Sequence, residues 1–179
     1  SRLSCVPATI DLAGAEIELV SVVARESRLQ RAIEAYCATN KVDYVFIDCP
    51  PSLGLLTLNA MVATQEVLIP IQFEYYALEG LGQLLKTIEL VRANLNPTVE
   101  ASTILLTMYD ARTRLADQVA EEVRTHFGDK VLATIIPRSL RVSEAPGYGP
   151  PVLPYHPGPP APVAPPAAAR EIAMRGAEA

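Results

Sequence analysis

The chain has 179 residues, of which 50% are hydrophobic, and a formal net charge of −5 at pH 7. This length favours a single α/β domain, and the negative charge argues against a globally basic nucleic-acid binder while leaving a local arginine cluster possible. Its three cysteines are widely spaced, which excludes a CxxC zinc site and a disulfide framework and favours a reducing cytoplasm.

The first elements in chain order are a helical segment and a short apolar run. Asp11–Tyr36 has a helical pattern and holds no clear strand, and Tyr44–Asp48 predicts a strand that is buried on both faces. Pro50 and Pro51 end that strand, which places Asp48 at its carboxyl end, where open α/β sheets bind ligands. The alternative is that Asp48 caps the following helix.

Three more strands alternate with two helices further along the chain. The strands are expected at Glu66–Gln72, Ser102–Tyr109 and Val131–Pro137. Leucines and valines at helical spacing predict one helix over Ala77–Leu95 and another over Leu115–Phe127. This alternation indicates a doubly wound, mostly parallel sheet with helices on both faces.

Two features depart from a standard doubly wound domain. The sequence holds neither GxxxxGK[ST] nor GxGxxG, so the backbone cradle that meets phosphate is missing from it. From residue 150 to residue 169 the chain is rich in proline and alanine, which favours extended, unpacked chain. Residues 170–179 regain a helix-forming composition but are too few to hold a helix unaided.

Five segments closely resemble the chromosomal ParA/Soj partition ATPases. In chain order they are PATIDLAGAE (7–16), DCPPSLG (48–54), EYYALEG (74–80), TMYDART (107–113), and IPR (136–138) followed by SEAP (143–146). The resemblance implies an ATPase of the P-loop NTPase type that dimerises around ATP and Mg²⁺. It also implies that the dimer binds DNA non-specifically and that a ParB-type partner stimulates hydrolysis, in the cytoplasm and on the nucleoid.

The same resemblance gives an expected domain organisation. Residues 1–149 would form the carboxyl-terminal part of a ParA-type ATPase domain, without the phosphate loop that precedes it in the family. Residues 150–169 would be a disordered low-complexity segment, and residues 170–179 a short tail. The 179-residue chain alone is therefore expected to be inactive.

The motifs also suggest roles for individual residues. Asp48 resembles the aspartate that holds Mg²⁺ in P-loop enzymes, which would make it the metal-binding and catalytic carboxylate. Arg112 and Arg141 match the arginines with which the family's dimers hold DNA phosphates. The alternative for both is an ordinary solvated arginine.

Four further residues have suggested roles, and three of them have an alternative. Met108 and Pro137, at the carboxyl ends of adjacent strands, either flank an adenine ring or pack at the edge of the sheet. Glu74 and Glu79 would serve the dimer interface, although Glu79 could simply stabilise the dipole of its helix.

Two alternative functions remain open at this stage. One is a non-catalytic remnant that still binds DNA or a partner. The other is a MinD-like ATPase on a membrane, which would need a basic amphipathic helix at the carboxyl end. Residues 170–179 lack a bulky apolar face, so no membrane association is expected.

Overall fold

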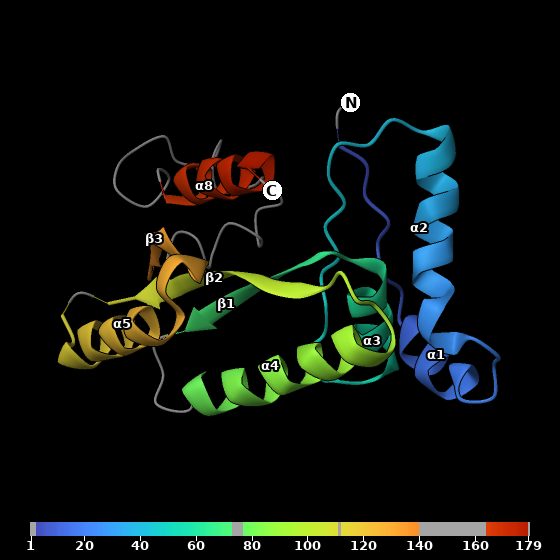
Figure 1. Cartoon of the computed structure of the whole chain (residues 1–179), viewed down its shortest axis with the longest axis horizontal. Coiled ribbons are helices and arrows are strands. Elements are labelled where there is room, and N and C mark those ends of the chain that lie inside the picture. The colour runs from blue at the N-terminus through green and yellow to red at the C-terminus, as the bar shows by residue number, and fades with distance from the viewer. Residues whose placement is uncertain (1–2, 73–76, 111, 140–163, 179) are drawn as a thin grey trace. The chain divides into compact units, whose positions relative to one another are not determined.

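The computed structural model describes residues 3–72, 77–110, 112–139 and 164–178 (Figure 1). The chain divides into two compact units. The first comprises Ser1–Gln65 and Lys86–Glu100, and the second comprises Glu66–Leu85 and Ala101–Ala179. Helix α4 (Ala77–Asn94) runs from the second unit into the first, and each unit is described separately below.

The second unit contains the sheet. Within the described residues three strands, β1 (Glu66–Gln72), β2 (Glu100–Tyr109) and β3 (Val131–Pro137), are hydrogen-bonded in the order β1-β2-β3. Strands β2 and β3 are parallel. The predicted bounds of β1 and β3 are confirmed, and β2 begins two residues earlier than expected. The predicted α/β fold with a parallel sheet is therefore confirmed.

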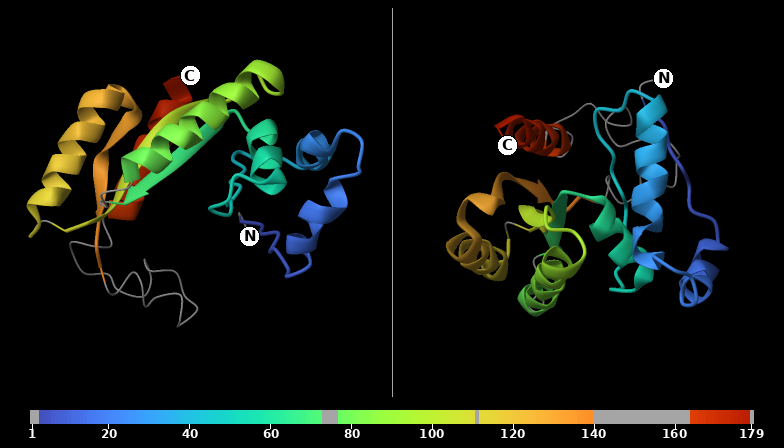
Figure 2. Two further views of the ribbon diagram at one scale, coloured as in Figure 1. Left: turned by 90° about the horizontal axis from the view of Figure 1, so that it is seen from below. Right: turned by 45° about the vertical axis from the view of Figure 1, so that its right-hand side comes forward.

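Helices cover both faces of β3. Helix α5 (Arg114–Phe127) turns Ala116, Val119 and Val123 inward, as the three-and-four spacing predicts. It ends at Gly128, whose positive φ of 51° suits a glycine, and the turn η2 (Gly128–Lys130) leads into β3. Helix α8 (Ala164–Glu178) packs on the opposite face of β3 (Figure 2).

Helix α8 begins at Ala164, six residues before the helix-competent tail expected from the sequence. Pro165 and Pro166 fall in its first turn, where a missing N–H breaks no helical bond, and three alanines follow. Tertiary packing then supplies the stability that a short helix lacks by itself, because Ala168 is buried.

The pairing of β2 with β3 contains two irregularities. Between the pairs Ile104↔Val131 and Leu106↔Ile135, β2 advances two residues while β3 advances four. Between Leu106↔Ile135 and Tyr109↔Pro137, β2 advances three and β3 two. Each strand therefore carries an irregularity with extra residues, two in β3 and one in β2, which we call a bulge. Bulges redirect the chain that follows them.

The first unit is built from helices. Its elements are α1 (Leu12–Leu19), the 3₁₀ turn η1 (Arg25–Ser27), α2 (Arg28–Thr39), α3 (Leu55–Ala63) and the carboxyl-terminal half of α4. The predicted helical segment is thus two helices, separated where Ala24 takes a left-handed φ of 53°. Helix α3 was not predicted; it packs against α2 and buries Ala60, Met61 and Val62.

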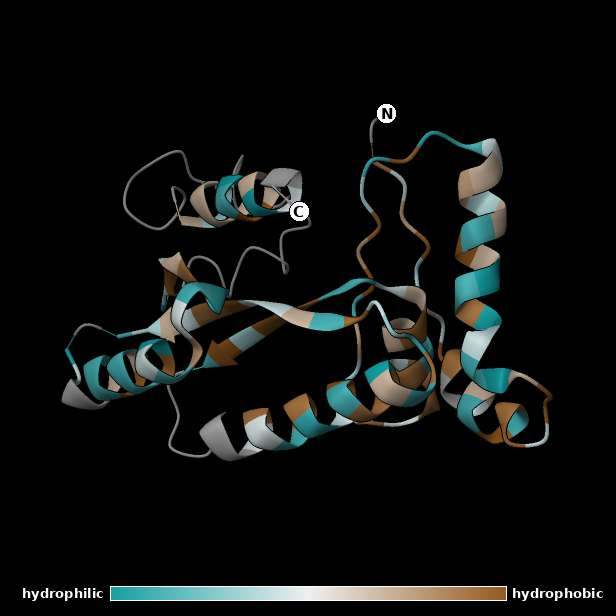
Figure 3. Ribbon diagram, in the orientation of Figure 1, coloured by the Kyte–Doolittle hydropathy of each residue, from teal (hydrophilic) through white to brown (hydrophobic). Residues whose placement is uncertain are grey.

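The strand predicted at Tyr44–Asp48 is wrong in this structure. The segment is extended coil, and its side chains are exposed, Phe46 at 78%, except for the half-buried Ile47. Figure 3 shows hydrophobic colour along this coil. An apolar run becomes a buried strand only when a neighbouring strand satisfies its N–H and C=O groups. Within the described ranges no strand pairs with Tyr44–Asp48.

Candidate functional site

The carboxyl ends of β2 and β3 bring several of the predicted site residues together. Tyr109 is paired with Pro137, and the N–H of Arg138 donates to the carbonyl of Tyr109 at 2.9 Å. Met108 precedes Tyr109 and Arg112 follows it in the next loop. Because parallel strands end at the same edge of a sheet, Met108, Pro137 and Arg112 belong to one site region of the second unit.

Met108 lies at the bulge in β2 and adopts an unusual backbone conformation. Its φ of 58° is left-handed, which is uncommon for a residue that has a Cβ atom. The bulge between Leu106 and Tyr109 explains this, since the extra residue must turn out of the ladder. The side chain is 39% exposed, so it is available to a flat apolar ligand, and Pro137 is half-buried.

Arg112 is held in place by Asp110. Its Nε donates to Asp110 Oδ1 at 2.9 Å and its Nη2 to Oδ2 at 2.7 Å, while its backbone N–H donates to Oδ1 at 3.1 Å. These bonds, led by the side-chain contact, hold the pKa of Asp110 well below its ordinary value of 3.8, and the charge of Arg138 adds to the effect. The Arg112 side chain remains 86% exposed. It is a fixed, outward-facing cation.

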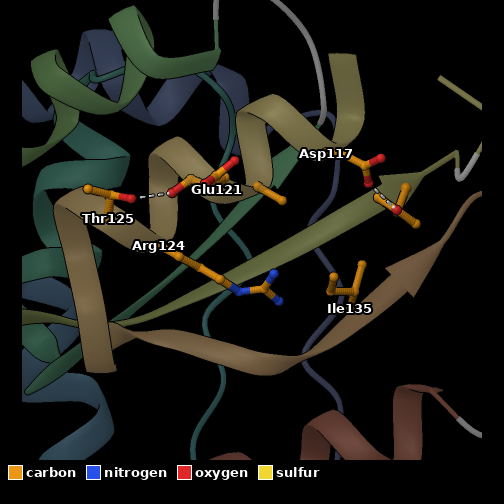
Figure 4. Close-up of a pocket in the computed structure, with 7 residues that line it drawn as sticks. Asp117, Glu121, Arg124, Thr125 and Ile135 are labelled. Atoms are coloured by element: carbon orange, nitrogen blue, oxygen red, sulfur yellow. Dashed lines mark hydrogen bonds between the residues drawn. The ribbon is translucent and has the colours of Figure 1, made fainter. Parts of the chain in front are cut away.

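An open hollow of about 400 Å³ lies beside this site, between helix α5 and the two strands (Figure 4). The Tyr109 hydroxyl donates to Asp117 Oδ1 at 2.5 Å, a bond that raises the pKa of Tyr109. The Arg124 guanidinium points into the hollow, toward Ile135 of β3. The sequence analysis did not single out any of these side chains, because ordinary helix-surface residues show the same pattern.

Asp48 belongs to the first unit. It is exposed, at the end of the extended coil and just before Pro50 and Pro51. The neighbouring Cys49 thiol bonds weakly to the Ile47 carbonyl, and burial, reinforced by the Asp48 charge, raises the pKa of Cys49.

Asp48 meets the requirements of Mg²⁺ only in part. Across the described residues no group of three His, Cys, Asp or Glu side chains could hold a metal. A single exposed carboxylate nevertheless suits Mg²⁺, which keeps several waters and takes its other ligands from phosphates. Asp48 can therefore contribute one ligand to Mg²⁺ that arrives with a nucleotide.

Three predicted site residues cannot be judged in the same way. Arg141 and Glu74 lie outside the described residues, and Glu79 falls in the first turn of α4.

None of the helices in the described ranges is long and apolar enough to cross a membrane.

Solved structures with this arrangement define the class of protein. A cobyrinic acid a,c-diamide synthase from Mycobacterium smegmatis, solved with bound ADP and magnesium, is 44% identical with a TM-score of 0.67. The match covers 74% of this chain and 54% of that one. The cell division ATPase MinD of Pyrococcus furiosus shares the fold at 22% identity and a TM-score of 0.63, over 83% of this chain and 58% of that one. The chain is an α/β protein of the P-loop NTPase class.

Sequence relatives identify the family. A family model described as an AAA domain matches residues 1–101. The sporulation initiation inhibitor protein Soj of Bacillus subtilis is 57% identical over 156 residues, 87% of this chain and 61% of that protein. The chromosome-partitioning ATPase Soj of Thermus thermophilus is 46% identical over 175 residues, 97% of this chain and 67% of that protein. The chain belongs to the ParA/Soj family of chromosome-partitioning ATPases.

The chain spans about three fifths of the Bacillus relative, 61% of its length, and 57% of the chromosome partitioning protein ParA of Caulobacter vibrioides.

Proposed function

We propose that this chain is part of a chromosome-partitioning ATPase whose ATP-bound dimer holds DNA without reading its sequence. The observation that carries the proposal is the 57% identity with Soj over 87% of the chain. The site at the ends of β2 and β3 supports it with an exposed arginine that is already oriented.

DNA binding is assigned to the arginines at this edge. Arg112 is exposed and fixed by Asp110. Arg138, the first residue after β3, is also exposed. Arg141 follows three residues later in the sequence. Arginines that contact phosphates give affinity without base readout and a steep dependence on salt. This is the behaviour needed by a protein that moves over DNA of any sequence.

Roles in nucleotide binding are assigned to three residues that the family motifs suggest. Met108 and Pro137 offer apolar surface for an adenine ring, and Asp48 offers a carboxylate ligand for Mg²⁺. When bound, the ion neutralises phosphate charge. The extended segment before Asp48 and the two prolines after it position its carboxylate.

The partners follow from the family. A second copy of the chain would assemble around the nucleotide, with Glu74 and Glu79 at the dimer interface. A ParB-type protein would stimulate hydrolysis, and the complex would act in the cytoplasm on the nucleoid.

The DNA assignment is tested with the Arg112→Ala plus Arg141→Ala variant. We expect it to bind two duplexes of equal length and unrelated sequence more weakly, and by the same factor, because phosphate contacts are lost. The salt slope should shrink by up to about two units, one per lost phosphate contact. Fluorescence anisotropy over a series of salt concentrations measures both quantities.

The matched control is Arg92→Ala plus Arg170→Ala, which removes the same charge from two exposed helical arginines. Its affinity should stay close to that of the unchanged chain. Measurable and equal binding by the two double variants would remove Arg112 and Arg141 from the DNA site.

A further inference from the structure

The carboxylate of Glu171 on helix α8 binds the backbone of β3. Its Oε1 accepts the N–H of Ala133 at 2.7 Å and its Oε2 accepts the N–H of Thr134 at 3.0 Å. Partial burial acts to raise the pKa of Glu171, but these two N–H groups, the Thr134 hydroxyl and the charge of Arg175 outweigh it and lower the pKa. Glu171 is therefore ionised at neutral pH, and each of its oxygens holds one N–H.

Arg175, one turn further along α8, binds the preceding part of the same strand. Its Nη1 donates to the carbonyl of Lys130 and its Nη2 to the carbonyl of Val131, both at 3.2 Å. It also pairs with Glu171 at 3.4 Å. Two side chains of one helix thus satisfy two N–H and two C=O groups of β3 and its approach.

The contacts of Glu171 coincide with the bulge in β3, and those of Arg175 lie just before it. The two extra residues lie between Val131 and Ile135, the interval that contains Ala133 and Thr134. A bulge leaves backbone groups out of the ladder; an unpaired N–H would be costly at the half-buried Thr134 and less so at the exposed Ala133. Glu171 supplies the acceptors that the bulged residues would otherwise lack.

The bulge determines which residues end up at the edge of the sheet. After it, Ile135 pairs with Leu106 and Pro137 with Tyr109, and the Arg138 N–H reaches the Tyr109 carbonyl. Without the two extra residues, the chain beyond Ile135 would advance by two positions along β2. At about 3.3 Å per residue, this is a displacement of about 7 Å.

We propose that Glu171 is a positioning residue: by binding the bulge in β3, with Arg175 holding the backbone just before it, helix α8 sets the register that places Pro137 and Arg138 beside Tyr109. The inference about register stands on backbone geometry. Its consequence for DNA and nucleotide binding rests on the proposed function.

The test is amide hydrogen exchange, followed by NMR on the ¹⁵N-labelled full chain. In Glu171→Ala the amides of Ala133 and Thr134 should exchange about tenfold faster, because their acceptors are gone. The Arg138 amide should accelerate by a similar factor, although its own acceptor, the Tyr109 carbonyl, is untouched. The Val123 amide, in the core of α5, should keep its rate.

Two further variants separate positioning from general stability. Glu171→Gln retains the size of the side chain and one acceptor oxygen, so it should restore part of the protection at Ala133, Thr134 and Arg138. It also serves if Glu171→Ala does not fold. Arg170→Ala, on the exposed side of the same helix, should leave all of these rates unchanged.

Two outcomes would overturn the proposal. One is a uniform acceleration that includes Val123, which would mean that Glu171 only stabilises the unit. The other is an unchanged rate at Arg138 when Ala133 and Thr134 accelerate. Because no DNA or nucleotide is present, this result is independent of the Arg112 and Arg141 experiment, and either proposal can fail without the other.

Discussion

Met108 shows how a single residue can carry strain at a binding edge. Its left-handed φ of 58° is forced by the bulge in β2, and no glycine stands there to relieve it. Strained positions of this kind gather where a protein must present a side chain in a defined direction. The strain therefore agrees with the nucleotide-binding role proposed for Met108.

The strain at Met108 can be measured. We expect Met108→Gly to leave the free energy of unfolding unchanged or raise it, because glycine accepts positive φ at no steric cost. Met108→Ile should lower it by about 1–3 kcal/mol, since a β-branched side chain tolerates this conformation poorly. Urea unfolding followed by circular dichroism measures the change.

Met108→Leu is the matched control, because it keeps the size and lacks the branch at Cβ. If the isoleucine and leucine variants unfold at the same urea concentration, the backbone at Met108 is not strained.

At the same scale, the sequence suggested candidate site residues but did not predict the contacts that hold them. Arg112 was found from its motif, but its bidentate partner Asp110 was not, although the two-residue spacing suits an aspartate that bonds back to the following backbone. The sequence pattern did not indicate a role for Glu171 and Arg175, because their partners are backbone atoms of a distant strand.

At the scale of elements, Asn96 secures the end of helix α3. It is 8% exposed, and its Nδ2 donates to the carbonyls of Met61, Val62 and Thr64 at 3.0, 3.2 and 2.6 Å. The last carbonyls of a helix have no intrahelical partner, so Asn96 supplies the hydrogen-bond donors that the end of α3 lacks. Its Oδ1 accepts the Thr98 N–H and hydroxyl, which fixes the amide orientation.

We therefore expect Asn96→Ala to lower the free energy of unfolding by about 2–3 kcal/mol, because it leaves buried carbonyls without donors. Thermal unfolding measures the effect. Asn94→Ala is the control: Asn94 also donates to a carbonyl, that of Leu90, but it is exposed, so the loss should be under about 0.5 kcal/mol. Equal losses in the two variants would contradict a capping role for Asn96.

The elements predicted most accurately are those whose partners lie within the described residues. β1, β3 and α5 follow directly from hydrophobic spacing, because each packs against its neighbours in the second unit. Tyr44–Asp48 has the same apolar character but stays a largely exposed coil. The hydrophobic pattern indicates that a segment can form a strand, but it does not show whether a neighbouring strand is there to pair with it. Helix α3 was missed because LLTLNAMVA has no polar face to mark a period.

At the scale of the whole chain, the sequence predicts that these 179 residues hydrolyse no ATP by themselves. It holds no Gly-rich loop with a lysine to cradle the phosphates, and catalysis of phosphoryl transfer depends on that positioning. Phosphate release should equal that of buffer, for the unchanged chain and for Asp48→Ala alike. Steady release that Asp48→Ala abolishes would contradict the prediction.

The contact between α8 and β3 also has an evolutionary consequence. Glu171 and Arg175 bond to main-chain atoms of Lys130, Val131, Ala133 and Thr134, which every non-proline residue provides. Of these positions the exposed Ala133 can vary most freely while the contact is kept, because Val131 is buried in the core and the Thr134 hydroxyl also contacts Glu171. Correlated substitutions between homologues would leave this contact without a trace, although it joins segments about forty positions apart in the chain.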